Sequence, residues 1–454
     1  MDLILGVGLV LGVMILVHEW GHFIAARLFQ VRVDVFSIGF GPRLFGWKRG
    51  ATDYRVSALP LGGYVRMAGQ DPTEIDSVGR TPGEPGSQMP TGAPDELMSK
   101  PRWQRAVISF AGPAVNLVFP ILLLTVYFVA LGVPYPVFED RPVVVTALPT
   151  NSAAAAAGLQ PGDKIAAVNG ETNPDWTAVS KIITKLEPGS KLAVDVENGG
   201  VKRTIEIPLR QKEIEQPEQA LGFYPIKPVL EDASPGLPAW KAGLRESDVI
   251  RGVDGKEIQW WGEFTEKVRG SSGRPLALDV ERKGQTLHMV VTPQSANNER
   301  GEAVYQIGVQ VHEDTAYRRV AFAEGVRFAS VKTFETIEDT IGVVGRLVSG
   351  KVSVKQLQSV VGISRAAGQA VHKGAQAVIS LMVLISVNLG ILNLLPIPIL
   401  DGGNILLLAI EGGLRRDLSM AFKERFVQVG LVFLLVLFAI VMYNDVVRLL
   451  PSHS

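Results

Sequence analysis

The residues of this chain best suited to chemistry are His18, Glu19 and His22, in the run His18-Glu19-Trp20-Gly21-His22. Two histidines four positions apart lie on one face of an α-helix, so both imidazoles can bind the same metal ion. The glutamate between them can reach a water molecule at that ion and act as a general base. Because Zn²⁺ lowers the pKa of such a water to about 7, the spacing predicts metal-assisted hydrolysis at neutral pH.

The motif lies inside a nearly unbroken apolar run from Leu3 to Leu28. Each ionisable side chain at the centre of a bilayer costs about 2–3 kcal/mol, so three of them there must have partners. A chance match, or structural polar contacts to a neighbouring helix, is the alternative interpretation. The placement favours hydrolysis carried out within a membrane.

The composition of the chain is balanced in charge and rich in apolar residues. The 454 residues carry 45 basic and 45 acidic side chains, 47% are hydrophobic, and the mean hydropathy is +0.21. These values favour a membrane protein with soluble parts and give no sign of nucleic-acid binding. Cysteine is absent, so histidine and carboxylate must hold any metal. We expect the first apolar run to be retained rather than cleaved, because it carries the candidate site.

Four segments are apolar and long enough to cross about 30 Å of hydrocarbon. They are, roughly, Leu3–Leu28, Val107–Leu131, Ala375–Leu395 and Val427–Val447. The loops between the first two and the last two are rich in arginine and lysine, which predicts that both loops are cytoplasmic and both termini external. The fold class expected is a polytopic α-helical membrane protein with four transmembrane helices and an external middle region.

The middle region contains an internal repeat with a spacing of 85 residues. Ala157-Gly158-Leu159, Asp163 and Trp176 recur as Ala242-Gly243-Leu244, Asp248 and Trp261. The pattern resembles the bacterial PDZ domain, a small α/β domain that can bind an extended peptide at a sheet edge. Domains with closed grooves that act as spacers or size filters are an equal alternative.

Three further segments complete the organisation. Asp34 to Met67 alternates apolar and polar residues and predicts β-hairpins beside the first span. Residues 71–101 are rich in Pro, Gly and Ser and predict a flexible cytoplasmic insert. The helical stripe from Phe328 to Val348 could lie on the outer membrane surface or pack on the second PDZ-like domain. The domains expected are 1–133, 134–220, 221–312, 313–374 and 375–454.

A third metal ligand is expected from the far end of the chain. Zinc in hydrolases usually takes three protein ligands, and the next histidine, His288, falls on the wrong side of the membrane. Asp401 follows two prolines that end or kink the third span, and unwound backbone at that depth is tolerated only around a buried or wet cavity. The first and third spans run in the same direction, so His18, His22 and Asp401 should meet near the cytoplasmic side. A helix-capping role for Asp401 is the alternative.

Together these features resemble the site-two protease family of intramembrane zinc metalloproteases, most closely a bacterial type within it. The segments that carry the resemblance are His18–His22, Phe36–Gly41, Pro60–Val65, Ala111–Asn116, the tandem repeat and Asn393–Gly402. The resemblance implies that His18, His22 and Asp401 bind Zn²⁺, that Glu19 activates water and that Asn393 helps to hold an unwound substrate strand. It also implies a membrane-associated β-hairpin that pairs with the substrate.

The same resemblance implies a bacterial inner-membrane protein with its active site near the cytoplasmic side. Its substrate would be a single-span membrane protein already trimmed outside, such as an anti-sigma factor or a remnant signal peptide. Two positions depart from the family pattern, Asn404 and the segment from Ser359 to Gly362, and both concern substrate handling rather than metal binding.

Two functions of other classes remain open from the sequence. A catalytically silent membrane scaffold would collect partners on its PDZ-like domains, and changing Glu19 would not impair it. A metal transporter or sensor would use the histidine pair but would need polar residues along more than one span, whereas the second and fourth spans are almost wholly apolar.

Overall fold

The computed structural model describes residues 2–70, 91–149, 152–215, 217–297, 303–349 and 360–449. Most of the expected insert, and Ser359 of the departing segment, therefore lie outside the described residues. The chain divides into two compact units. We call residues 1–133 with 319–454 the helical unit and residues 134–318 the sheet unit.

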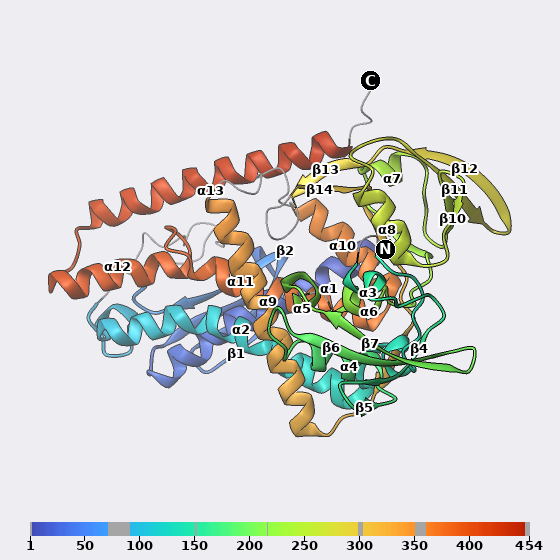
Figure 1. Ribbon diagram of the computed structural model, residues 1–454. Coiled ribbons are helices and arrows are strands. Elements are labelled where there is room, and N and C mark those ends of the chain that lie inside the picture. The colour runs from blue at the N-terminus through green and yellow to red at the C-terminus, as the bar shows by residue number, and fades with distance from the viewer. Residues whose placement is uncertain are drawn as a thin grey trace. The chain divides into compact units, whose positions relative to one another are not determined.

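Long helices dominate the helical unit (Figure 1). They are α1 (Asp2–Leu28), α2 (Arg102–Leu131), α9 (Phe322–Val348), α10 (Val360–Lys373), α11 (Ala375–Leu394), α12 (Asp401–Leu414) and α13 (Met420–Leu449), with a short 3-10 helix η1 (Leu97–Ser99) before α2. Among the described residues, α2 and α11 are long and apolar enough to cross a membrane. Each of the four segments expected to span the membrane forms a helix, and α10 and α12 are additional helices that were not expected.

Helix α2 packs against four other helices of the helical unit, α1, α9, α11 and α12. Leu124 and Phe128 on its second half are buried with Val383 of α11 and Ala329 of α9. Pro113 and Pro120 lie inside α2, and each removes one backbone N–H donor from the helix. Two carbonyls on α2 are therefore left to find partners outside the helix.

Helix α9 is the amphipathic segment expected from the helical stripe. Its small and hydroxylated side chains, Ala329, Thr333 and Thr340, are buried, and the helix packs against α2 and α11. The apolar side chains Phe328 and Phe334 point away from these helices and are exposed. The helix packs on α2 and α11 through its small residues, so its bulky apolar face stays uncovered. The two alternatives for that apolar face, the outer membrane surface and the second PDZ-like domain, stay predictions.

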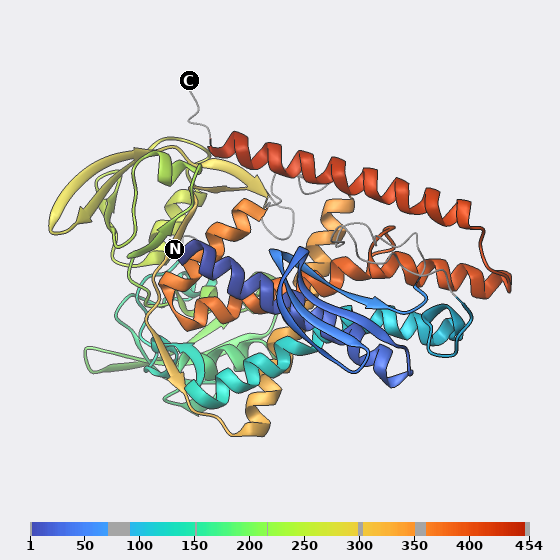
Figure 2. The ribbon, with the colours of Figure 1, turned by 180° about the vertical axis from the view of Figure 1, so that it is seen from behind.

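The strands expected between residues 34 and 67 form one long antiparallel hairpin, β1 (Val33–Arg49) with β2 (Thr52–Met67). Both strands bend, so that Phe36 lies opposite both Val65 and Tyr54. Val33 and Phe36 are buried with Ala25 and Ala26 of α1, which holds the base of the hairpin against that helix (Figure 2). The turn end is exposed and carries Trp47 next to basic residues.

The sheet unit contains the repeat in three dimensions. The first copy comprises α3 (Ala153–Ala156), β4 (Lys164–Val168), β5 (Glu171–Thr172), α4 (Trp176–Ile183), β6 (Lys191–Asn198) and β7 (Val201–Pro208). The second comprises α7 (Pro238–Lys241), β9 (Val249–Val253), β10 (Lys256–Glu257), α8 (Trp261–Arg269), β11 (Leu276–Arg282) and β12 (Gln285–Val291). Their sheets have the matching strand orders β5-β4-β6-β7 and β10-β9-β11-β12.

The other described elements between residues 133 and 318 are short. They are β3 (Val133–Pro136), η2 (Val137–Asp140), α5 (Gln211–Glu215), α6 (Glu218–Leu221), β8 (Leu230–Ala233), β13 (Gln294–Asn297), β14 (Ala303–Gln306), β15 (Val309–Val311) and β16 (Thr315–Arg318).

Each copy has its own core and a buried aspartate that is paired with an arginine. Asp163 and Asp248 are fully buried at matching positions, and each is bound by an arginine from its own sheet, Arg203 and Arg282 respectively. Burial by itself raises the pKa of Asp163, but hydrogen bonds from Asn198, the Gln160 amide and Arg203 together lower it below its ordinary value. The repeated aspartate is therefore a structural residue of the sheet unit.

Candidate metal centre

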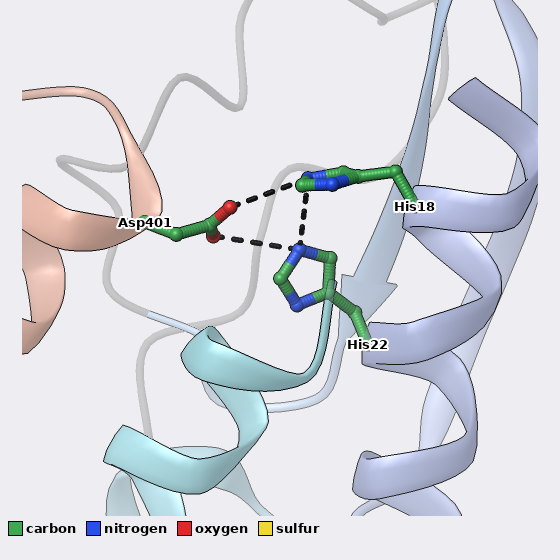
Figure 3. Close-up of side chains that lie close together, drawn as sticks. All are labelled: His18, His22 and Asp401. Carbon is green, nitrogen blue, oxygen red and sulfur yellow. Dashed lines mark hydrogen bonds and ion pairs between the residues drawn. The ribbon is translucent and has the colours of Figure 1, made fainter. Parts of the chain in front are cut away.

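Three side chains from two helices that are far apart in the sequence meet in the helical unit. The Nε2 atom of His18 lies 3.2 Å from Oδ2 of Asp401, and the Nε2 atom of His22 lies 3.4 Å from Oδ1 of the same carboxylate. The two Nε2 atoms are 3.2 Å apart. Figure 3 shows both rings projecting from α1 toward a carboxylate that comes from α12.

The donor set suits a small divalent cation. Imidazole nitrogen and carboxylate oxygen bind zinc at about 2.0–2.2 Å, and donors of a tetrahedral site at that distance are about 3.3 Å from one another. The distances between the donor atoms of His18, His22 and Asp401 are 3.2, 3.2 and 3.4 Å, which is close to that value. Both histidines are buried, so few water molecules compete for their nitrogens. Among the described residues this is the one group of three such side chains that could hold a metal.

Close packing of α1 against α2 sets the orientation of His22. A side-chain carbon at Gly21 would lie 2.5 Å from the backbone oxygen of Ala111, and one at Gly112 would lie 2.3 Å from Nε2 of His22. Real side-chain carbons do not approach so closely, so only glycine fits at both positions. The Nδ1 atom of His22 donates to the backbone carbonyl of Ile108 at 2.8 Å. This hydrogen bond leaves Nε2 as the nitrogen that faces Asp401.

The turn between α11 and α12 sets the position of Asp401. Helix α11 ends at Leu394, two prolines follow, and Ile399 has a left-handed φ of 84° before α12 starts at Asp401. A side-chain carbon at Gly402 would lie 2.3 Å from the backbone oxygen of Leu395. The first turn of α12 can therefore fold against the preceding turn only with glycine next to Asp401.

Glu19 faces the same centre from a cavity. The cavity is about 300 Å³ and is lined by His18, His22 and Asp401 together with Glu19, and by residues of the hairpin, α2, α11 and α13. The side chain of Glu19 lies beside β2, because a side-chain carbon at Gly63 would be 3.1 Å from its Cγ atom and Val65 lines the same cavity. A carboxylate held beside the three donors is placed to take a proton from a reacting water.

Asn393 lies on the last turn of α11. Its Nδ2 atom is 3.3 Å from Nε2 of His18, and its side chain lines the cavity. All the site residues expected from the sequence (His18, Glu19, His22, Asn393 and Asp401) are thus brought to one cavity. The roles assigned to them remain predictions.

The sequence reasoning missed the contributions of α2. Ile108 and Gly112 hold the ring of His22, and the amide of Asn116 contacts Nδ1 of His18 at 3.1 Å. Gly112 and Asn116 belong to a segment that carried the family resemblance, but no role was assigned to either residue. Their spacing of four residues on an apolar helix was the available signal.

Comparison with known proteins identifies the family. The chain matches the model of peptidase family M50 over residues 7–437. It is 34% identical over 458 residues to the regulator of sigma-E protease RseP of Escherichia coli, covering 97% of each chain. It is 33% identical over 457 residues to RseP of Salmonella typhimurium, again with 97% of each chain covered.

A third relative has a more general name. A protein of Neisseria meningitidis, provisionally named a zinc metalloprotease, is 33% identical over 454 residues, covering 96% of this chain and 97% of that protein. The expected resemblance to a site-two protease of the RseP type, the regulator of sigma-E protease, is confirmed by these matches. The family match covers nearly the whole length of the chain and includes His18, His22 and Asp401, so the chain belongs to peptidase family M50.

Proposed function

We propose that this chain is an intramembrane zinc endopeptidase that cleaves transmembrane segments of single-span proteins. The observation that carries the proposal is the convergence of His18, His22 and Asp401 beside Glu19 in one cavity. Membership of a peptidase family and a relative named for zinc support the same assignment.

His18, His22 and Asp401 would hold Zn²⁺ through two imidazole nitrogens and a carboxylate oxygen. Bound zinc supplies a Lewis acid that polarises a carbonyl and lowers the pKa of water. Glu19 takes the proton from the attacking water and later delivers it to the leaving amine. Asn393 has an amide N–H close to the centre, and this group is suited to donate to a backbone carbonyl of the substrate.

The substrate must present an extended backbone to this cavity. A transmembrane helix hides its peptide bonds in internal hydrogen bonds, and an unpaired backbone group in lipid costs several kcal/mol. Tyr64 and Val65 of β2 line the cavity next to Glu19. We infer that the hairpin and Asn393 supply the hydrogen bonds that an unwound substrate segment loses.

The proposal places the chain in a bacterial inner membrane with four spans, α1, α2, α11 and α13. The basic loops would be cytoplasmic, and both termini and the sheet unit periplasmic. The domains would be the first two spans with hairpin and insert (1–133), two PDZ-like domains (134–220 and 221–312), a juxtamembrane segment (313–374) and the last two spans (375–454).

Substrates and partners follow from the relatives. Two of them are named regulators of sigma-E, so we propose a membrane-bound anti-sigma factor or a remnant signal peptide as the substrate. The PDZ-like domains would bind carboxyl-terminal peptide ends or exclude untrimmed proteins by their bulk. The lipid bilayer is the remaining partner, and no nucleic acid is expected.

Conversion of Glu19 to glutamine tests the proposal directly. Glu19→Gln keeps the size of the side chain and all three donors of the metal centre but cannot accept a proton. We expect the purified variant in liposomes to bind as much zinc as wild type and to leave a tagged single-span substrate without its outer domain uncleaved. The wild type should cleave it and stop when a zinc chelator is added.

The control is Glu338→Gln, the same substitution at an exposed position of α9 outside the cavity, and it should remain active. Turnover by Glu19→Gln at the wild-type rate would contradict the assignment. If wild type binds zinc but cleaves none of a panel of single-span substrates, the scaffold function becomes the better account.

A further inference from the structure

Helix α2 contacts a candidate metal ligand through the side-chain amide of Asn116. Its Nδ2 atom lies 3.1 Å from Nδ1 of His18, on the side of the ring away from Asp401. The side chain is fully buried, and its Oδ1 atom is buried without a hydrogen-bond partner. An unpaired acceptor in such a place costs about 1–3 kcal/mol, so it calls for a functional explanation.

The hydrogen-bonding needs of a metal-binding histidine explain the unpaired acceptor of Asn116. An imidazole that binds a metal through Nε2 carries its remaining proton on Nδ1 and needs an acceptor for that proton. His22 has such an acceptor in the carbonyl of Ile108. Asn116 is the residue that can serve His18, because half a turn about its Cβ–Cγ bond replaces Nδ2 by Oδ1 at the same place.

The backbone of Asn116 is held in place from a second helix. Proline at position 120 has no N–H, so the carbonyl of Asn116 has no donor four residues further along α2. The hydroxyl of Ser386 on α11 donates to this carbonyl at 2.7 Å, and both residues are fully buried. Asn116 is therefore fixed relative to α11, the helix that leads into Asp401.

We propose that Asn116 is the positioning residue of His18, whose amide turns to present Oδ1 to Nδ1–H and so directs Nε2 at the metal. The inference rests on the proposed function, since it assumes that the centre binds zinc. It makes one face of α2 the support for both histidines, with Ile108 and Gly112 holding His22 and Asn116 holding His18.

Zinc affinity of the full-length chain in detergent, measured by competition with a chromophoric chelator, tests the inference without reference to activity. Asn116→Leu keeps the volume but removes the acceptor, and we expect the zinc dissociation constant to rise about 10–100-fold, the usual effect of losing such a partner. Asn116→Asp keeps only acceptors, and its affinity should equal or exceed that of wild type. Val118→Leu, at an exposed position of α2, is the matched control and should bind like wild type.

The zinc affinities of the Asn116 variants test the positioning role, and that of wild type tests the proposed function. Folded Asn116→Leu with wild-type affinity would overturn the positioning role, and so would a loss of ten-fold or more in Asn116→Asp. If the leucine variant does not fold, Asn116→Ala removes the same acceptor and decides the question, and wild-type zinc affinity in that variant would overturn the positioning role. A wild-type chain that takes up no zinc would instead contradict the proposed function itself.

Discussion

At the scale of single residues, the candidate centre separates groups that would bind the metal from groups that would bind the substrate. Asp401 faces both imidazoles with its two oxygens, whereas Asn393 approaches with an amide nitrogen, which is a donor and not a metal ligand. The two residues should therefore fail in different ways when they are removed.

We expect Asp401→Ala to lose both zinc and activity, because one of three protein ligands is removed. Asn393→Ala should keep its zinc and lose one hydrogen bond to the substrate, which is worth about 1–3 kcal/mol or roughly 5–150-fold in kcat/KM. Metal content by atomic absorption together with steady-state cleavage separates the two effects. Loss of zinc from Asn393→Ala would show that it belongs to the metal centre instead.

At the scale of elements, the contact between α1 and α2 decides whether His22 can point at the centre. Gly112 lies in the interior of α2, where replacement by alanine ordinarily stabilises a helix by up to about 1 kcal/mol. The added methyl group would instead occupy the space of the His22 ring. Steric displacement of the ring should outweigh the gain in helix propensity.

We predict that Gly112→Ala weakens zinc binding at least ten-fold and abolishes most cleavage, since a ligand displaced by about 1 Å can cost about 100-fold in rate. Gly12→Ala in α1 is the matched control, because nothing lies within 4 Å of the methyl group it adds. Chelator competition and thermal unfolding of both variants provide the measurements. Equal zinc affinity in the two variants would contradict the steric argument.

At the scale of the whole molecule, the proposal depends on which side of the membrane each part occupies. The hairpin should face the cytoplasm and the sheet unit the periplasm, as the distribution of basic residues predicts. The chain contains no cysteine, so a single introduced thiol reports on its own position without any background.

We expect Lys202→Cys, at an exposed position of strand β7, to react with a membrane-impermeant maleimide in intact spheroplasts. Lys48→Cys, near the exposed turn of the hairpin, should react only after the membrane is permeabilised. Cleavage activity of each variant serves as the control for folding. The reverse labelling pattern would contradict the proposed topology and the placement of the active site near the cytoplasmic side.

Features that depend only on neighbours along the chain could be predicted from the residues. A spacing of four residues places His18 and His22 on one helix face whatever surrounds the helix, because the periodicity is a property of the backbone. The 85-residue repeat likewise predicted two similar sheets, and each copy contains its own core and its own buried aspartate.

Contacts between side chains of separate helices could not be predicted in this way, because they depend on how the helices pack. Asp401 could be suggested from topology, but its distance to the histidines depends on how α12 folds against the end of α11 through Gly402. The contact of Asn116 with His18 depends on the rotation of α2 about its axis, and a pattern of apolar residues all around a helix does not specify that rotation. Packing between helices, rather than periodicity within them, decided the surroundings of the metal centre.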